Sequence, residues 1–134
     1  MKNSLINLIN KYNEPHEGLL IDNKVDVYAQ KLLDNAIILT YYDKKLIAFI
    51  AFYANDFISK NAFLSLILVD KSLRGKKIAN QLLSNSIEIL KIKKFKKYNL
   101  EVLKINKKAI KLYTGFGFKI VDESEMFYKM SLHL

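Results

Sequence analysis

The sequence predicts an α+β fold in which a mixed, mostly antiparallel sheet is flanked by helices. Three observations favour this class. Two stretches of helical periodicity open the chain, three strand-like runs follow them, and from residue 76 onward helical and strand-like periods alternate. The expected order is α-α-β-β-β-α-β-α-β-β. At 134 residues the chain is long enough to bury a real core, and we expect a single domain over residues 1–134.

The two N-terminal helices are predicted from apolar residues that repeat on one helical face. These residues are Leu5, Leu8, Ile9 and Tyr12 in the first helix and Val25, Tyr28, Ala29, Leu32 and Leu33 in the second. Pro15 and Gly18 mark a loop between the two helices. Asp22 or Asn23 is suited to the start of the second helix, because a short polar side chain can accept a hydrogen bond from the first turn.

The next three elements are predicted to be strands. Residues 36–42 and 46–53 are rich in isoleucine, phenylalanine and tyrosine, and the polar residues 43–45 between them are typical of a hairpin turn. A polar loop then precedes a third apolar run at 63–69. Because short connections join antiparallel neighbours, these runs indicate an antiparallel meander.

The second half of the chain alternates helix and strand. A helix is predicted from Lys76, and its apolar stripe consists of Ala79, Leu82, Leu83, Ile87 and Leu90. The remaining predicted elements are a strand at 98–103, a helix at 106–116, and strands at 118–122 and 126–132. Asn106 is suited to cap its helix, and Gly117 to the left-handed position that ends it. Since a helix joins the strands at 63–69 and 98–103, we expect that pair to be parallel.

Composition excludes several kinds of site. The chain has no cysteine, so it has no disulfide, no thiolate metal site and no cysteine nucleophile. His16 and His133 lie near opposite ends of the chain without other metal-binding residues beside them, so we expect no metal. The first residues do not resemble a signal peptide, and no apolar run approaches the ~20 residues that span a bilayer. We therefore expect a cytoplasmic protein without a membrane partner.

The net charge of +9 raises the question of a polyanionic partner. Of the 22 basic residues, Arg74 is the one arginine, and much of the excess lies in residues 91–97. In that segment Ile92 and Phe95 are spaced for the buried side of a helix end, which leaves the lysines in solvent. Arginine reads phosphates and bases better than lysine does. We therefore favour a solvated lysine surface over a specific nucleic-acid partner, with nucleic-acid binding as the alternative.

Two motifs carry a resemblance to a known family. Residues 69–79 contain Arg74 and Ala79 at fixed positions of the pattern R/Q-x-x-G-x-G/A, and residues 106–118 fit N-x-x-A-x-x-L-Y-x-x-x-G-F at every fixed position. Over roughly residues 36–130 the chain resembles the GNAT superfamily of acetyl-CoA-dependent N-acetyltransferases. It departs from the family pattern at Lys77, where glycine is usual and would permit a close approach of backbone to phosphate.

The resemblance implies that the chain binds acetyl-CoA. It implies a splayed parallel strand pair at the cofactor site, where pantetheine pairs with exposed strand backbone, and a helix start whose N–H groups hold the pyrophosphate. The cofactor-binding residues implied in this way are Leu68, Val69, Arg74, Gly75, Lys76, Lys77, Ile78, Ala79, Asn106 and Ala109. Among them, Leu68 and Val69 act through their backbone, and Arg74 is expected to be an auxiliary contact or a brace for the loop.

Two catalytic residues follow from the same resemblance. Tyr113 matches the family tyrosine that protonates the departing thiolate, and a phenol, whose pKa is ordinarily ~10, is suited to that transfer. Without the motif, Tyr113 would be interpreted as a core residue. Glu101 lies in a Leu-Glu-Val strand similar to one in ribosomal-protein alanine acetyltransferases, where a glutamate is the proposed base. We expect that strand to be covered on both faces. Alternatively, Glu101 is paired with a lysine or faces water, and a water chain removes the proton.

The main hypothesis is therefore an enzyme that transfers acetyl from acetyl-CoA directly to a primary amine of a small metabolite, with amino sugars among the candidates. One alternative is acetylation of protein N-termini, which is suggested by Glu101. Another is a CoA-binding regulatory module without turnover. The acceptor site is expected beside the two N-terminal helices, the 54–61 loop and the last hairpin, and nothing ranks its residues. Homodimers are common in the family, but the sequence indicates no specific interface.

Overall fold

The computed structural model describes residues 1–13 and 24–134. Its elements are α1 (Lys2–Tyr12), α2 (Val25–Asn35), β1 (Ile37–Asp43), β2 (Lys45–Tyr53), β3 (Asn61–Val69), the 3-10 turn η2 (Lys71–Leu73), α3 (Ile78–Ile92), β4 (Lys97–Leu103), α4 (Lys107–Gly115), β5 (Lys119–Glu123) and β6 (Phe127–His133). The predicted loop at Pro15 and Gly18 and the predicted helix start at Asp22 or Asn23 lie outside the described residues. None of the helices in the described part is long and apolar enough to cross a membrane.

The strands form one six-stranded sheet in the order β1-β2-β3-β4-β6-β5. Neighbouring strands are antiparallel except for β3 and β4, which are parallel because α3 carries the chain between them. The predicted α+β class, element order and parallel pair are thus confirmed. The predicted boundaries differ from the observed ones by at most two residues. Helix α3 begins at Ile78 and not at Lys76, because Gly75 and Lys77 have positive φ and interrupt helical geometry.

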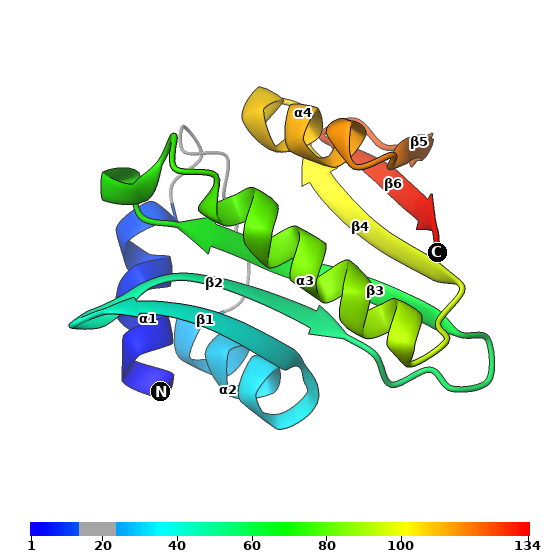
Figure 1. Ribbon diagram of the computed structural model, residues 1–134. Coiled ribbons are helices and arrows are strands. Elements are labelled where there is room, and N and C mark those ends of the chain that lie inside the picture. The colour runs from blue at the N-terminus through cyan, green and yellow to red at the C-terminus, as the bar shows by residue number, and fades with distance from the viewer. Residues whose placement is uncertain (14–23) are drawn as a thin grey trace.

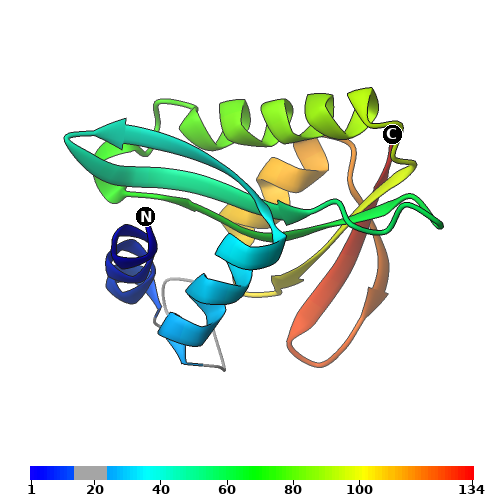
Figure 2. The same ribbon diagram turned by 90° about the horizontal axis from the view of Figure 1, so that it is seen from below.

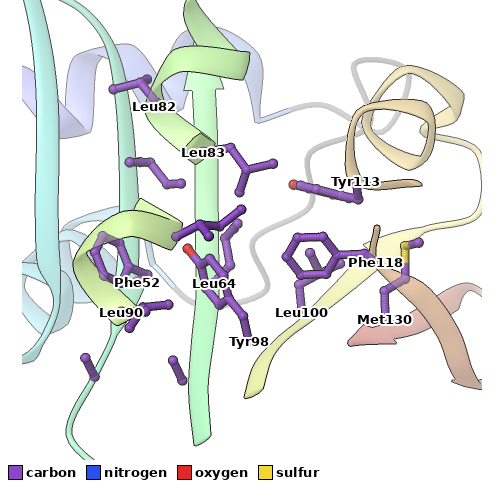
Figure 3. Close-up of a cluster of buried hydrophobic side chains, with 14 of the residues drawn as sticks. Phe52, Leu64, Leu82, Leu83, Leu90, Tyr98, Leu100, Tyr113, Phe118 and Met130 are labelled. Carbon is purple, nitrogen blue, oxygen red and sulfur yellow. The ribbon is translucent and has the colours of Figure 1, made fainter. Parts of the chain in front are cut away.

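Hydrophobic residues form two cores on the two faces of the sheet. On one face, α3 and α4 cover residues of β2, β4 and β6, and Figure 3 shows Leu83, Tyr98, Tyr113 and Phe118 within this core. On the other face, α1 and α2 pack against β2 and β3. Figures 1 and 2 show α3 on one side of the sheet and α1 with α2 on the other. The α1 and α2 core draws on the β1–β3 half, and no other helix of residues 1–13 and 24–134 covers that face of β4, β6 and β5.

A bulge in β3 changes which face its side chains point to. In the pairing with β2, Ala51 opposes Leu66 and Phe52 opposes Leu64, so Ser65 is the extra residue. Leu64 packs in the α3 and α4 core, whereas Leu66 packs in the α1 and α2 core, although they are two positions apart and would share a face in a regular strand. The bulge therefore reverses the alternation, and it falls where β3 and β4 separate.

The parallel strands β3 and β4 splay apart. Their pairing runs from Asn61 with Lys97 to Leu64 with Leu100 and then stops. Beyond that point β3 continues to Val69 and β4 to Leu103 without pairing to each other. Figure 1 shows the two halves of the sheet diverging toward α4. One edge of β3 is therefore free along its last residues, which is the strand separation that the family resemblance implied.

The lysine-rich segment at 91–97 only partly follows its prediction. Phe95 is buried and meets the ring of Phe57 at 5.8 Å between centroids, as its spacing suggested. Ile92, predicted to lie on the buried side, is instead 72% exposed. The reason is that α3 ends at Ile92, and Lys94 takes a left-handed conformation that turns the chain before Phe95. The buried side at this helix end is thus formed by Leu90 and Phe95.

Candidate functional site

A cleft of about 740 Å³ lies between the splayed ends of β3 and β4. The start of α3 and the inner side of α4 also line it. The predicted site residues found in its lining are Leu68, Val69, Arg74, Gly75, Lys77, Ile78, Ala79, Glu101, Asn106, Ala109 and Tyr113. Two segments distant in the sequence, the loop after β3 and the helix after β4, therefore meet in one cavity.

Lys76 is the predicted cofactor residue that does not line the cleft. Its backbone N–H donates to the Leu73 carbonyl at 3.2 Å, so this N–H is committed to the turn and unavailable to a phosphate. Asn80, in the first turn of α3, lines the cleft in its place. Sequence reasoning missed Asn80 because the motif ends at Ala79, although the free N–H groups of a helix extend through its first turn.

The N-terminus of α3 faces the cleft without a side-chain cap. Lys77 precedes the helix with φ 60° and ψ 27°, and its side chain makes no capping hydrogen bond. This is the left-handed region that glycine adopts without strain, which explains why glycine is usual here in the family pattern. The N–H groups of Ile78, Ala79 and Asn80 have no intrahelical partner, and the helix dipole adds partial positive charge. The arrangement can hold an anion.

The turn between β3 and α3 is held by a buried carboxylate. Asp70 is the N-cap of η2 and accepts a hydrogen bond from the Ser72 N–H at 3.0 Å. Its other oxygen accepts from the Lys11 ammonium at 2.8 Å. These hydrogen bonds, with that from Lys11 the strongest, hold the pKa of the Asp70 carboxyl well below its usual range, against the opposing effect of burial. Asp70 is therefore an anion that ties the turn to the end of α1.

Tyr12, also at the end of α1, braces the same turn. Its hydroxyl accepts a hydrogen bond from the Lys71 N–H at 2.9 Å, and the Tyr12 side chain is almost fully buried. The Arg74 guanidinium lies over the Tyr12 ring, with its central carbon 5.2 Å from the centroid. Arg74 thus contacts α1 while it lines the cleft, which supports the expected role of its side chain as a brace for the loop.

Helix α4 brings Asn106 and Tyr113 to the opposite wall. The Asn106 side chain accepts a hydrogen bond from the Ala109 N–H at 3.2 Å, so the predicted cap is confirmed. Tyr113 is buried, and its ring lies 5.7 Å from that of Phe118. Burial raises the pKa of the Tyr113 hydroxyl well above its usual value, which keeps it protonated. In Figure 3 this hydroxyl points away from α4 toward Leu83.

Glu101 lies on the other face of β4 from this core. Tyr98, Leu100 and Val102 point into the α3 and α4 core, so Glu101 points away from it. Its side chain is 47% exposed, and its carboxylate lies 4.0 Å from the Lys129 ammonium. The expectation that this strand is covered on both faces is therefore wrong at Glu101. The physical reason is that α1 and α2 pack on the β1–β3 half and do not reach over β4.

No group of three or more histidine or acidic side chains that could hold a metal occurs in the described residues. The cleft offers instead an unpaired strand edge, a helix N-terminus, a protonated phenol and one carboxylate. The strand edge and the helix N-terminus can hold an extended anionic ligand. The phenol and the carboxylate can each exchange a proton with it.

The family model described as "Acetyltransferase (GNAT) family" matches residues 5–118. The PaiA N-acetyltransferase of Thermoplasma acidophilum, in complex with coenzyme A, superimposes with a TM-score of 0.80 at 21% identity, covering 99% of this chain and 92% of that one. The ribosomal-protein-S18-alanine N-acetyltransferase of Escherichia coli gives 0.79 at 17% identity, with 98% and 86% covered. An aminoglycoside 6'-N-acetyltransferase complexed with coenzyme A gives 0.78 at 16%, with 98% and 89% covered. No curated protein matches the chain in sequence.

Proposed function

The chain belongs to the GNAT family of acetyltransferases, and on this premise we propose that it transfers acetyl from acetyl-CoA directly to a primary amine of a small metabolite. The observation that carries the proposal is that one cleft brings together the free edge of β3, the start of α3, Tyr113 and Glu101. These elements serve two tasks, which are to hold the donor and to move protons.

The cleft residues fit acetyl-CoA along its length. The N–H groups of Ile78, Ala79 and Asn80 hold the pyrophosphate, and the cations of Arg74 and Lys77 offset its charge. The free edge of β3 at Leu68 and Val69 pairs with the pantetheine amides as an added strand would. Asn106 and Ala109 of α4 line the opposite side. The similar folds crystallised with coenzyme A support this assignment.

Tyr113 serves as the general acid. When a neutral amine attacks the acetyl carbonyl carbon, a C–N bond forms, the C–S bond breaks, and the electron pair goes to sulfur. Tyr113 donates its phenolic proton to that sulfur, and Glu101 accepts the proton that the nitrogen loses. Exchange with solvent then returns a proton to Tyr113 and removes one from Glu101.

Glu101 serves as the general base. It lines the cleft from the face opposite Tyr113, so the amine can approach the carbonyl from one side while the thiolate leaves toward the other. The exposure of its carboxylate leaves room for a substrate ammonium or a bridging water.

The test is thiol release from acetyl-CoA with a panel of primary amines. We expect release that depends on the amine and falls about 100-fold in Tyr113→Phe, a typical loss for a positioned proton donor. Tyr41→Phe removes a hydroxyl from an exposed tyrosine on β1 and is the matched control. Acetyl-CoA binding without thiol release for any amine would instead favour a regulatory CoA-binding module.

Acetylation of protein N-termini is the second candidate, and Glu101 between Leu100 and Val102 is the observation that favours it. The fold similarity to the ribosomal-protein-S18-alanine enzyme is consistent with this candidate. A peptide with a free N-terminal alanine, tested beside the small amines, separates the two. Faster turnover of the peptide than of every small amine would replace the main proposal with this one.

A further inference from the structure

The two ends of the cleft differ in charge. Two cationic side chains, Arg74 and Lys77, line the part assigned to the phosphates, and Lys108 of α4 also lines the cleft. Among the described lining residues, Glu101 is the one acidic side chain, and it lies at the other end with Phe63 and Phe127. The acceptor end therefore combines one negative charge with aromatic surface.

Glu101, Phe63 and Phe127 share one face of the sheet. Ala62 and Leu64 point into the α3 and α4 core, so Phe63 between them points the other way, as Glu101 does. On β6, Tyr128 packs against that same core, so the side chains of Phe127 and Lys129 on either side of it also point away.

The register of the strands places Glu101 directly opposite Lys129 and puts the two phenylalanines on either side of this pair. Phe63 is opposite Asn99 and Phe127 is opposite Leu103, each two positions along β4 from Glu101. No helix covers this part of the face in the part of the chain that the structure describes, so a small molecule can reach it.

The ion pair in this group is open to solvent. The Glu101 carboxylate and the Lys129 ammonium are 4.0 Å apart, and their side chains are 47% and 56% exposed. A pair of this kind contributes little to the folded state, so each partner can turn to a ligand at small cost. Phe63, 40% exposed, offers an apolar surface next to the two charges.

We propose that the acceptor is a small α-amino acid with an aliphatic or aromatic side chain, an assignment that rests on the proposed function. Its ammonium binds Glu101, its carboxylate binds Lys129, and its side chain packs on Phe63. A zwitterion of this kind carries its two charges one carbon apart and satisfies both members of the pair. Glu101 takes one proton from the ammonium, and the neutral amine then attacks the acetyl carbonyl as described above.

The same charges disfavour a polycation. A polyamine or an aminoglycoside brings several positive charges to an end of the cleft that holds one carboxylate and a neighbouring ammonium. The chain as a whole carries a net charge of +9, which adds long-range repulsion. A single ammonium balanced by its own carboxylate avoids both costs.

The experiment compares L-phenylalanine with phenethylamine, which is the same molecule without the carboxylate. Binding of each to the full-length protein saturated with coenzyme A is measured by calorimetry, and thiol release from acetyl-CoA is measured separately. We expect tighter binding and lower KM for L-phenylalanine. Lys129→Met should weaken binding of L-phenylalanine about fivefold, the effect of a half-exposed ion pair, and leave phenethylamine unchanged within twofold. Lys91→Met removes the same charge from an exposed position near the end of α3 and should change neither.

Each outcome decides one point. Three results would overturn the amino-acid assignment while leaving acetyl transfer intact. They are equal binding of the two ligands, equal effects of Lys129→Met on both, and a preference for spermidine or kanamycin. Binding of L-phenylalanine that depends on Lys129, with no thiol release, keeps the assignment of the site and overturns the proposed catalysis.

Discussion

Removal of the Tyr12 hydroxyl is the sharpest test of how α1 supports the cofactor loop. The variant Tyr12→Phe keeps the ring under Arg74 and removes the hydroxyl that accepts from the Lys71 N–H at 2.9 Å. Because Tyr12 is 2% exposed, water does not readily replace the lost partner. The cost is the loss of one largely buried hydrogen bond, about 1–2 kcal/mol of unfolding free energy.

For 134 residues this loss corresponds to a fall in Tm of about 4–7 °C. Thermal unfolding followed by circular dichroism measures the shift, and calorimetric titration with coenzyme A measures whether the loop still holds the cofactor. We expect weaker coenzyme A binding, since Lys71 and Arg74 belong to the turn that leads into α3. Tyr41→Phe, on an exposed strand position, should change neither quantity. A Tyr12→Phe protein with wild-type Tm and wild-type affinity refutes the brace.

Three further predictions concern the turn after β3 and the cleft. Because the pKa of Asp70 is depressed in the folded state, its carboxylate stabilises the fold above the unfolded pKa of ~3.9, and this contribution is lost as pH falls through the lower folded pKa. The stability deficit of Asp70→Asn, measured by urea unfolding, should therefore shrink on acidification below about pH 4. A deficit that is constant with pH counts against the ion pair. Gly75→Trp should abolish coenzyme A binding in calorimetry, because Gly75 has φ 90° and lines the cleft. Arg74→Lys should weaken coenzyme A binding only a few-fold. Equal losses in the two variants would show that the Arg74 side chain matters more than the backbone. Tyr113→Phe should lower kcat about 100-fold with coenzyme A affinity unchanged, and a parallel loss of affinity would indicate a packing role instead.

The elements that follow local rules could be predicted from the sequence. Asn106 caps α4 through its side chain, and Gly117 after that helix has φ 99°, as a left-handed C-terminal position requires. Both assignments depend on interactions within a few residues. Helix α3 starts later than predicted because Lys77 adopts the left-handed conformation. Lysine has no intrinsic preference for that conformation, so the residue type alone did not predict it.

Long-range contacts could not be predicted in the same way. Residues 12 and 71 are joined by a hydrogen bond across 59 positions, and no periodicity in either segment signals that contact. The exposure of Glu101 has a similar origin. Its strand is apolar at Leu100 and Val102, but coverage of the second face depends on where α1 and α2 dock, and they dock on the other half of the sheet.

The bulge at Ser65 shows why the opening of the cleft could not be predicted from the sequence pattern alone. In sequence, Ala62, Leu64, Leu66 and Leu68 alternate as one buried face would, yet the extra residue at Ser65 places the first pair in one core and the second pair in the other. The alternation is therefore compatible with a regular strand, and only the docking of helices on both faces makes the reversal favourable. Because the parallel pairing of β3 ends at Leu64, the bulge also coincides with the point where the strand edge becomes free for a ligand. One inserted residue thus connects the division of the core with the opening of the cleft.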